Sequence, residues 1–491
     1  MSWKEAAEPV LTRMPSVTRP EGHVPFRRKL GWTAGVLVLY FFLTNVTLFG
    51  LQTQTTSGDF YGQFRSILAG STGSLLQLGI GPIVTASIVL QLLGGANLLG
   101  LDTDDPRDQV LYQGLQKVLV LAMICLTGLP MVFASNYLPP SGEVAAALFG
   151  SSGALMPVRA LIFAQIAVGA VLILFMDEVI SKWGVGSGIG LFIIASVSQQ
   201  LVAGLFATEA LANVTGFFPA WVGIVTGGID LEGSLLEALL FEPGNLLAMV
   251  TTLFIFAVVV YAESVRVEIP LSHARVKGAR GRFPVKLIYA SVLPMILVRA
   301  LQANVQFLGQ ILYSQLGDVG MPDWLGVYSD GQPVGGLFYY LDPVQSREQW
   351  MWFIYAPAGD PLDIAVRVLI DLTVMVVGGA IFAIFWVETT GMGPESTAQQ
   401  IQNSGMQIPG FRRNPQVIEK VMERYIPQVT VIGGALVGFL AVLANLLGTI
   451  GGVSGTGLLL TVSITYKLYE EIAEEQLMEM HPMMRTMFGG D

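Results

Sequence analysis

Ionisable side chains are rare in the apolar segments of this 491-residue chain, and five stand out: Lys117, Arg159, Arg299, Arg367 and Asp371. A charged group in such a segment is by default a candidate functional residue. Most of the five lie near segment ends, where long side chains reach polar surroundings. Arg299 and Asp371 are deeper, and we expect them either to pair with each other in a structural role or to face water.

Other patterns that carry chemistry are missing from the sequence. His23, His273 and His481 lie outside the apolar runs and Cys125 is the single cysteine, so neither a buried histidine metal site nor an intrachain disulfide is expected. The glycine run GVGSGIG at 184–190 does not fit the dinucleotide pattern GxGxxG, and no GxxxxGK[ST] phosphate loop occurs. We therefore expect no catalytic residue, no metal and no cofactor, and an enzyme is the least favoured class.

The elements that hold these residues are predicted to be membrane spans. The chain is 53% hydrophobic and 13% charged, whereas soluble proteins are about 25% charged. A helix needs about 20 mostly apolar residues to cross a bilayer. The candidate spans are 31–50, 75–99, 110–134, 157–180, 187–204, 245–262, 286–308, 364–387, 428–449 and 454–472. The preceding segment, 1–29, is polar and proline-rich, so it does not predict a cleaved signal peptide.

Lysine and arginine gather in alternate loops. They occur in the segment 1–29 and in the loops 263–286 and 388–426, whereas 205–244 contains neither residue and 310–360 contains only Arg347. Because basic loops stay on the cytoplasmic side, both termini are predicted to be cytoplasmic in a multi-pass protein of the cell membrane. The net charge of −10 favours a high-salt cytoplasm, in which salt screens the self-repulsion of an acidic protein.

Helix breakers occur at corresponding places in two halves of the chain. The second span, which contains GIGPIVTASIVLQLL at 79–93, has Pro82 near its start, and the seventh span has Pro294 within SVLPMIL. Five spans precede the segment 205–244 and five follow it. Breakers in matching spans are typical of inverted repeats with a functional interface between them.

Two further patterns concern local packing. Residues 51–74 are too short to cross a bilayer but carry a small apolar face at helical spacing, which indicates a re-entrant helix. GxxxG pairs occur at Gly31–Gly35 and at Gly434–Gly438. Such pairs predict that a second helix approaches closely at each position.

Long stretches of the sequence resemble the SecY family, whose members form the central subunit of a protein-conducting channel. They are LGIGPIVTASIVLQLL (78–93), SGIGLFI (187–193), GRFPVKLIYASVLPMIL (281–297), SGMQIPGFRR (404–413) and GTGLLLTVSITYKLYEEI (455–472). The resemblance runs over essentially the whole chain. The closing EEQLMEMHP at 474–482 is similar to the archaeal branch, which suits the halophile-like composition.

The resemblance implies an all-α polytopic membrane protein. Ten transmembrane helices would form two inverted five-helix halves, 30–204 and 245–472, arranged as a clamshell around a central pore. The segment 205–244 would be an external hinge, and 473–491 a cytoplasmic tail.

The resemblance also implies roles for individual residues. A constriction ring of aliphatic side chains would consist of Ile80, Val84, Ile189, Ile193, Ile296 and Leu460. A plug at about 57–70 would close the outer funnel with Phe60, Tyr61, Phe64, Ile67 and Leu68. A lateral gate between spans 2 and 7 would include Thr85, Pro82, Pro294 and Asn304. Ribosome docking would use Arg275, Lys277, Arg280, Arg282, Arg412 and Arg413.

The function implied by the resemblance is a passive channel. It would conduct unfolded secretory polypeptides and release hydrophobic segments sideways into the lipid bilayer. The implied partners are a SecE-like (gamma) and a beta small membrane subunit, a translating ribosome, and signal peptides with their nascent polypeptides. Composition without the resemblance leaves a secondary transporter with inverted repeats as the alternative.

Overall fold

The computed structural model describes most of the chain. The residues outside the description are 1–7, 10, 23, 53–67, 96–99, 101–105, 135–137, 152, 209–214, 228–238, 242–243, 274–279, 287–292, 330–331, 355–359, 404–405, 408–414 and 481–491.

The long helices of the first half each overlap one of the first five predicted spans. They are α2 (Phe26–Thr44), α4 (Gly81–Gly95), α5 (Pro106–Leu129), α7 (Leu155–Trp183) and α8 (Gly188–Phe206). α5 continues as a π-helical turn, η2 (Pro130–Ala134), where Pro130 has no N–H to continue the α-helical ladder. A short helix, α6 (Gly142–Phe149), follows before α7.

The long helices of the second half match the remaining five predicted spans. They are α12 (Leu246–Ser264), α13 (Leu293–Gly320), α15 (Pro361–Thr389), α17 (Pro415–Leu447) and α18 (Gly455–Met480). α13 starts later than the predicted span 286–308 and extends beyond it, and α17 starts within the predicted loop 388–426. The positions of the spans were therefore predictable, but their ends were not.

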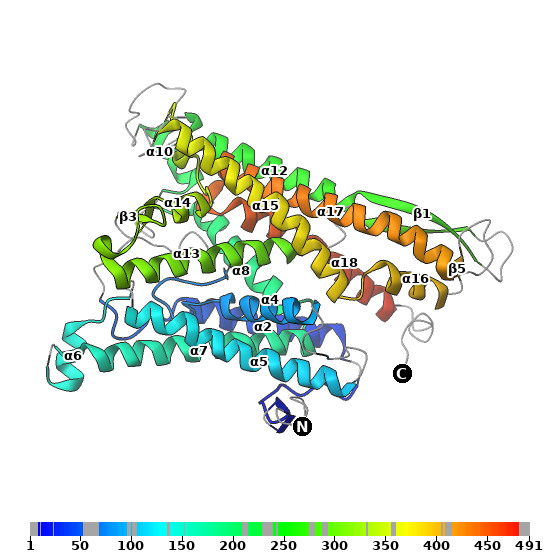
Figure 1. Ribbon diagram of the computed structural model, residues 1–491, viewed down its shortest axis with the longest axis horizontal. Coiled ribbons are helices and arrows are strands. Elements are labelled where there is room, and N and C mark those ends of the chain that lie inside the picture. Colours follow the sequence, from blue (N-terminus) through cyan, green and yellow to red (C-terminus); the bar gives the residue numbers. More distant parts are fainter. Residues whose placement is uncertain are drawn as a thin grey trace.

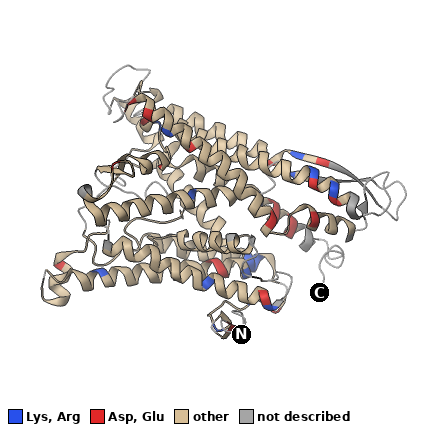
Figure 2. Ribbon diagram, in the orientation of Figure 1, with Lys and Arg blue, Asp and Glu red and all other residues tan. Residues whose placement is uncertain are grey.

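Seven of the described helices are long and apolar enough to cross a membrane by these two properties alone: α5, α7, α8, α12, α13, α15 and α17. α4 has only 15 residues, and α2 and α18 carry several charged residues toward one end. Figure 2 shows the same distribution over the described residues: Lys, Arg, Asp and Glu gather near the helix ends and leave the middle of the bundle almost free of them.

The two halves face each other across α4 and α13. In Figure 1, α2, α5 and α7 lie along one side, α12, α15 and α17 lie along the opposite side, and α4 and α13 run between them. α13 packs against both α4 and α15. The main apolar core includes Ile83 of α4, Phe192 of α8 and Met375 of α15, so it extends through both halves.

The two basic loops contain a small sheet, which we did not predict. β1 (Arg266–His273) and β2 (Arg280–Lys286) form an antiparallel hairpin, and β5 (Met406–Gln407) pairs with the end of β1. A helix, α16 (Pro394–Asn403), lies in the second loop and packs against α17. The described parts of the loops 263–286 and 388–426 therefore form one projecting unit, which lies beside the first turns of α17 at one end of the molecule in Figure 1.

The hairpin is fixed to α18 at its base. Arg266 and Lys286 are cross-strand partners in the register of β1 and β2. Both form ion pairs with Glu470 of α18, with 3.1 Å between Arg266 Nη2 and Glu470 Oε1. The Lys286 ammonium also lies over the Tyr466 ring, 5.8 Å from its centroid. α18 and the hairpin are thus joined at the point where the hairpin leaves the bundle.

The opposite end of the molecule carries short elements that we also did not predict. They are α10 (Phe217–Thr226), β3 (Val327–Ser329), β4 (Gln332–Gly335), α14 (Leu337–Leu341), η3 (Arg347–Gln349) and η4 (Ile450–Gly452). Tyr328 of β3 stacks on Tyr313 of α13 with ring centroids 4.8 Å apart. Within the segment 310–360, the described elements β3 and α14 therefore pack against α13.

The two GxxxG pairs have different surroundings. A Cβ atom at Gly434 or Gly438 would overlap the backbone of α15, at Gly379 and Met375 respectively, so the predicted close packing is confirmed for α17. At Gly31 and Gly35 no described atom lies within 4 Å of an added Cβ, so the described part of the chain does not show the predicted helix packing there. These two glycines lie on an outward face of α2, which no described helix covers.

Candidate functional site: the seam, the plug root and the ring

The seam between α4 and α13 contains the predicted gate residues. Asn304 Nδ2 donates a hydrogen bond to Thr85 Oγ1 over 3.3 Å. The Thr85 hydroxyl in turn donates to the Gly81 carbonyl, 2.9 Å away in the preceding turn of α4. A cavity of about 30 Å³ adjoins Thr85 and Asn304 and is also lined by Leu68. It has room for about one water molecule.

The two predicted breakers lie at helix starts. Pro82 is the second residue of α4, and Pro294 is the second residue of α13; both are buried. Proline is tolerated in the first helical turn because the N–H it lacks would have no intrahelical partner. Neither proline therefore interrupts a helix, and each marks where a seam helix begins.

The end of the predicted plug is held against the start of α4. The Ile80 N–H donates to the Leu68 carbonyl over 2.7 Å, and Leu68 is buried. Gly79 has φ +52°, and an added Cβ would overlap the Leu68 carbonyl. Only a glycine fits this close approach without strain. The other predicted plug residues, Phe60, Tyr61, Phe64 and Ile67, lie outside the described residues.

The six predicted ring residues come from helices of both halves. Ile80 directly precedes α4 and Val84 lies in its first turn, whereas Ile189 and Ile193 belong to α8. The second half contributes Ile296 of α13 and Leu460 of α18. All six join the main apolar core; Ile189 is half-buried and the other five are at most 4% exposed. Their role as a pore constriction stays a prediction.

An acidic residue that the sequence analysis missed positions one of these ring residues. Asp177 near the end of α7 accepts a hydrogen bond of 3.0 Å from the Ile189 N–H in the first turn of α8. The next residue, Glu178, pairs with Lys117 of α5 over 3.0 Å and with Lys182 over 2.6 Å. The Asp-Glu pair at the end of an apolar run was the available signal. Through these contacts, Asp177 and Glu178 together fix α5, α7 and the start of α8 relative to one another.

Arg299 and Asp371 form a buried ion pair, which is one of the two alternatives expected from the sequence; the other was exposure to water. Arg299 Nη1 lies 3.2 Å from Asp371 Oδ1, and the two side chains are 2% and 1% exposed. Gln302 accepts a hydrogen bond of 2.8 Å from the same nitrogen, and Arg299 Nε donates to Thr456 over 3.2 Å. The pair therefore joins α13 to α15 and α18 within the second half.

A second buried arginine, Arg367 of α15, forms an ion pair near the start of its helix. Arg367 Nη2 lies 2.6 Å from Asp342 Oδ2, and the guanidinium lies over the Tyr339 ring. Burial raises the pKa of Asp342 to about 6, and the charge of Arg367 opposes the rise. The sequence analysis expected such an arginine to reach polar surroundings at the end of its segment. Instead, Arg367 is held by a specific partner, Asp342, in the loop before α15.

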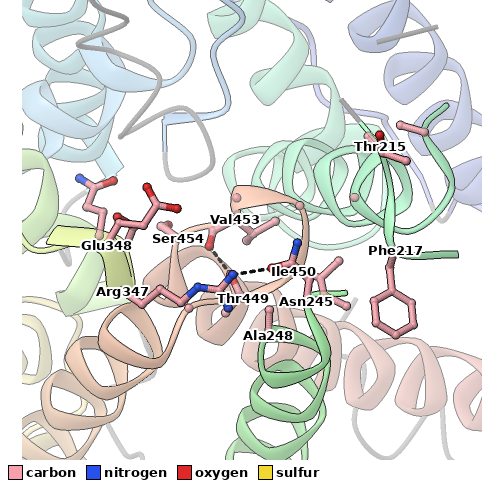
Figure 3. A pocket seen from close by; sticks show the side chains of 18 of the residues that line it. Thr215, Phe217, Asn245, Ala248, Arg347, Glu348, Thr449, Ile450, Val453 and Ser454 are labelled. Atoms are coloured by element: carbon pink, nitrogen blue, oxygen red, sulfur yellow. Dashed lines mark hydrogen bonds between the residues drawn. The ribbon is translucent and has the colours of Figure 1, made fainter. Parts of the chain in front are cut away.

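A pocket of about 610 Å³ lies where the end of α8 in the first half meets the second half (Figure 3). Its walls include the end of α8 from the first half and η4 from the second half, which touch at Gly204 and Gly451. Figure 3 shows the Arg347 side chain reaching toward Asn245, whose Oδ1 accepts a hydrogen bond from Arg347 Nη2. The pocket therefore marks the junction next to the predicted hinge segment 205–244.

The predicted docking residues are only partly described. Arg275, Lys277, Arg412 and Arg413 lie outside the described residues. Arg280 and Arg282 belong to β2, where they pair in register with Ser272 and Pro270. The hairpin thus presents both positions on the projecting unit of the two basic loops.

Comparisons with known proteins match the whole chain. The SecY family profile matches residues 74–469, and the profile of the plug domain of Sec61p matches residues 38–73. The protein translocase subunit SecY of Haloferax volcanii is 76% identical, with 100% of each chain covered. This similarity confirms the prediction of an archaeal, halophile-type sequence.

Solved structures agree with the sequence comparisons. The structure described as that of a protein-conducting channel has a TM-score of 0.77 and 37% identity, covering 97% of this chain and 98% of that chain. The channel of the canine ribosome–channel complex from the endoplasmic reticulum has a TM-score of 0.74 and 37% identity with the same coverage. The predicted ten-helix membrane fold is thereby confirmed, and the chain belongs to the SecY family.

Proposed function

We propose that this chain forms the pore of a protein-conducting channel in the cell membrane. The channel passes unfolded secretory polypeptides across the membrane and releases hydrophobic segments sideways into the bilayer. The observation that carries the proposal is the seam between α4 and α13, where two spans from different halves meet through the Thr85–Asn304 contact. Full-length similarity to protein-conducting channels supports the same function.

The chemistry of the six ring residues suits a pore for polypeptides. A passing chain has an arbitrary sequence, so a constriction built on specific hydrogen bonds would favour some sequences over others. The aliphatic side chains of Ile80, Ile193, Ile296 and the other ring positions can yield to any chain. An apolar constriction also excludes ions by dewetting when no polypeptide is present.

The seam suits lateral release. On the insertion scale each leucine favours the membrane by about 0.5 kcal/mol, whereas a central lysine or arginine costs about 2.5 to 3.5 kcal/mol. A segment of about 20 apolar residues therefore leaves through the seam into lipid, and a polar chain continues through the pore. Thr85 and Asn304 are uncharged, so their separation exposes no ion to the bilayer.

The proposal includes the division of the chain and its orientation. The segment 1–29 and the tail 473–491 are cytoplasmic, the halves 30–204 and 245–472 move about the external segment 205–244, and the loops 263–286 and 388–426 project into the cytoplasm. The positive-inside distribution of lysine and arginine supports this orientation. The junction of the two halves at Gly204 and Gly451 supports a hinge there.

The cytoplasmic unit of the two basic loops is proposed to dock a translating ribosome, whose exposed RNA is anionic. The similar canine channel was solved in a ribosome–channel complex, which supports this partner. A SecE-like (gamma) subunit and a beta subunit are proposed as membrane partners on family resemblance alone. The channel has no energy source of its own in this proposal, and the ribosome supplies the drive.

Site-specific crosslinking tests the proposal. A secretory chain is stalled on a ribosome with a photoreactive residue in the translocating segment, and the crosslinked positions are mapped. We expect crosslinks at Ile80, Val84, Ile189, Ile193, Ile296 and Leu460. Val225 of α10, which is 81% exposed away from the ring, is the control position and should give none. Absence of ring crosslinks together with saturable flux of small solutes would favour the secondary transporter instead.

A further inference from the structure

Tyr40 of α2 is buried and bonded to the end of the predicted plug. Its side chain is 1% exposed, and its hydroxyl donates a hydrogen bond of 2.9 Å to the Ala69 carbonyl. Ala69 directly follows Leu68, whose carbonyl is bound by the Ile80 N–H. We call Leu68–Gly70 the plug root. Two adjacent carbonyls of the root are therefore bound from two sides, by α2 and by the start of α4.

The plug root has an unfavourable backbone conformation at the residue that Tyr40 binds. Ala69 has φ +50°, in the left-handed region that alanine rarely adopts. Such a conformation persists only when its surroundings enforce it, and it is typical of functional segments. The Tyr40 hydroxyl is one of the groups that enforce it here, because it binds the carbonyl of that same residue.

On its other side Tyr40 contacts the helix that carries two ring residues. Its ring stacks on Phe192 of α8, with centroids 5.1 Å apart and planes inclined by 22°. Its hydroxyl also hydrogen-bonds to Ser196. Ile189, Phe192, Ile193 and Ser196 follow the spacing of one helix face. Tyr40 therefore lies between the plug root and the face of α8 that presents Ile189 and Ile193.

We propose that Tyr40 is the positioning residue of the plug: it holds the plug root against the ring helix α8 in the closed channel. When a polypeptide enters and displaces Ile189 and Ile193, α8 moves relative to α2. Phe192 and Ser196 then shift away from Tyr40, and the hydrogen bond to Ala69 weakens. Entry of a chain is thereby coupled to release of the root. This role rests on the proposed channel function.

The Tyr40→Phe variant tests the role because it removes the hydroxyl and keeps the stack on Phe192. Loss of one ordinary hydrogen bond changes an equilibrium about fivefold. We expect the resting ion conductance of the complete channel in planar bilayers to rise by about that factor, and a secretory protein with a weakened signal sequence to cross more readily. Tyr261→Phe is the matched control, because Tyr261 is 72% exposed on α12 and should change neither readout.

A second arm separates positioning from a purely structural role. In a channel that lacks residues 58–67, the plug is gone, so Tyr40→Phe should add nothing to the conductance of the deletion. A merely structural tyrosine would lower the thermal stability of both backgrounds and leave the resting conductance unchanged. Equal conductance of Tyr40→Phe and the natural channel, both folded, overturns the proposal.

Two further outcomes are informative. If Tyr40→Phe does not fold, Ser196→Ala replaces it; this variant removes the second partner of the hydroxyl and is expected to raise conductance by a smaller factor. Unchanged conductance in folded Ser196→Ala would then overturn the proposal. If the natural channel itself passes no polypeptide, the proposed channel function is overturned. If the natural channel passes polypeptides but its conductance does not depend on Tyr40, only the role of Tyr40 is overturned.

Discussion

The amide nitrogen of Asn304 in α13 lies 3.3 Å from the hydroxyl oxygen of Thr85 in α4, so a long, uncharged hydrogen bond joins the two halves at the seam. The Thr85 hydroxyl keeps its bond to Gly81 within α4 whether or not the seam is closed. Breaking this polar contact when the helices part costs about one neutral hydrogen bond, on the order of 1 kcal/mol. The apolar contacts between α4 and α13 add to that cost, but the separation leaves no unpaired charge behind.

Replacing Asn304 by leucine should make the seam harder to open. The substitution exchanges a polar contact for apolar packing beside the small cavity at Leu68 and Pro82. We expect the closed state to gain about 1 kcal/mol, and a substrate with a weak signal sequence to cross several-fold more slowly. Translocation of a strong and a weak substrate is compared in the same vesicles. A proportional loss for both substrates would point to a general defect rather than to the seam.

Deletion of residues 58–67 should raise ion leakage without abolishing translocation. The deletion removes most of the predicted plug but keeps Leu68 and its bond to Ile80. The ring residues and the seam remain, so a polypeptide still has a path. Conductance in planar bilayers is the measurement. A resting conductance equal to that of the natural channel would show that this segment does not seal the pore.

Asp371→Asn should strongly destabilise the second half. The substitution leaves the Arg299 charge buried without its counter-charge, and removing one partner of a buried pair costs about 3–5 kcal/mol. Replacing both residues, as Arg299→Met with Asp371→Leu, should recover most of this loss. The midpoint of thermal unfolding is measured for each variant, with the exposed Asp323→Asn as a control near zero. Equal stability of the single and double variants would refute the pairing argument.

The channel should be more stable in molar potassium chloride than in dilute buffer. Its net charge of −10 creates self-repulsion that salt screens. Exposed ion pairs weaken under the same conditions, but such pairs contribute little individually. The unfolding temperature is followed over a salt series. A lower unfolding temperature in molar salt would contradict an adaptation to a saline cytoplasm.

The sequence predicted the spans well because they depend on a local property, the length of an apolar run, whereas the seam was implied by the resemblance to a family. Apolar length located every long helix, and Pro82 and Pro294 marked the starts of the two seam helices. For Arg299 and Asp371 the sequence left two alternatives, a mutual pair or exposure to water, and the structure shows the pair. For the spans, the physical requirement is an apolar run long enough to cross a bilayer. It acts on a short stretch of chain, so the residues of each span carry the signal themselves.

The sheet of β1, β2 and β5 was not predictable by the same means. Pro270 and Pro284 lie within β1 and β2, and proline argues against a strand. β5 pairs with β1 only at Ser272 and His273, so at Pro270 the strand β1 has β2 on one side and no described strand on the other. Proline is tolerated there as on an edge strand. Likewise, the bond from the Ile189 N–H to Asp177 depends on how α7 and α8 meet. Contacts between distant segments set both features, and no local pattern encodes them.

The attachment of the hairpin of β1 and β2 to Glu470 has a mechanical consequence. α18 is continuous from Gly455 to Met480 and carries both Glu470 and the ring residue Leu460. The ten-residue separation corresponds to about 15 Å along a helix. A load applied to the hairpin is therefore transmitted along α18 toward Leu460, a predicted ring residue that is buried in the apolar core. The hairpin and the predicted ring residue Leu460 are thus mechanically connected through α18.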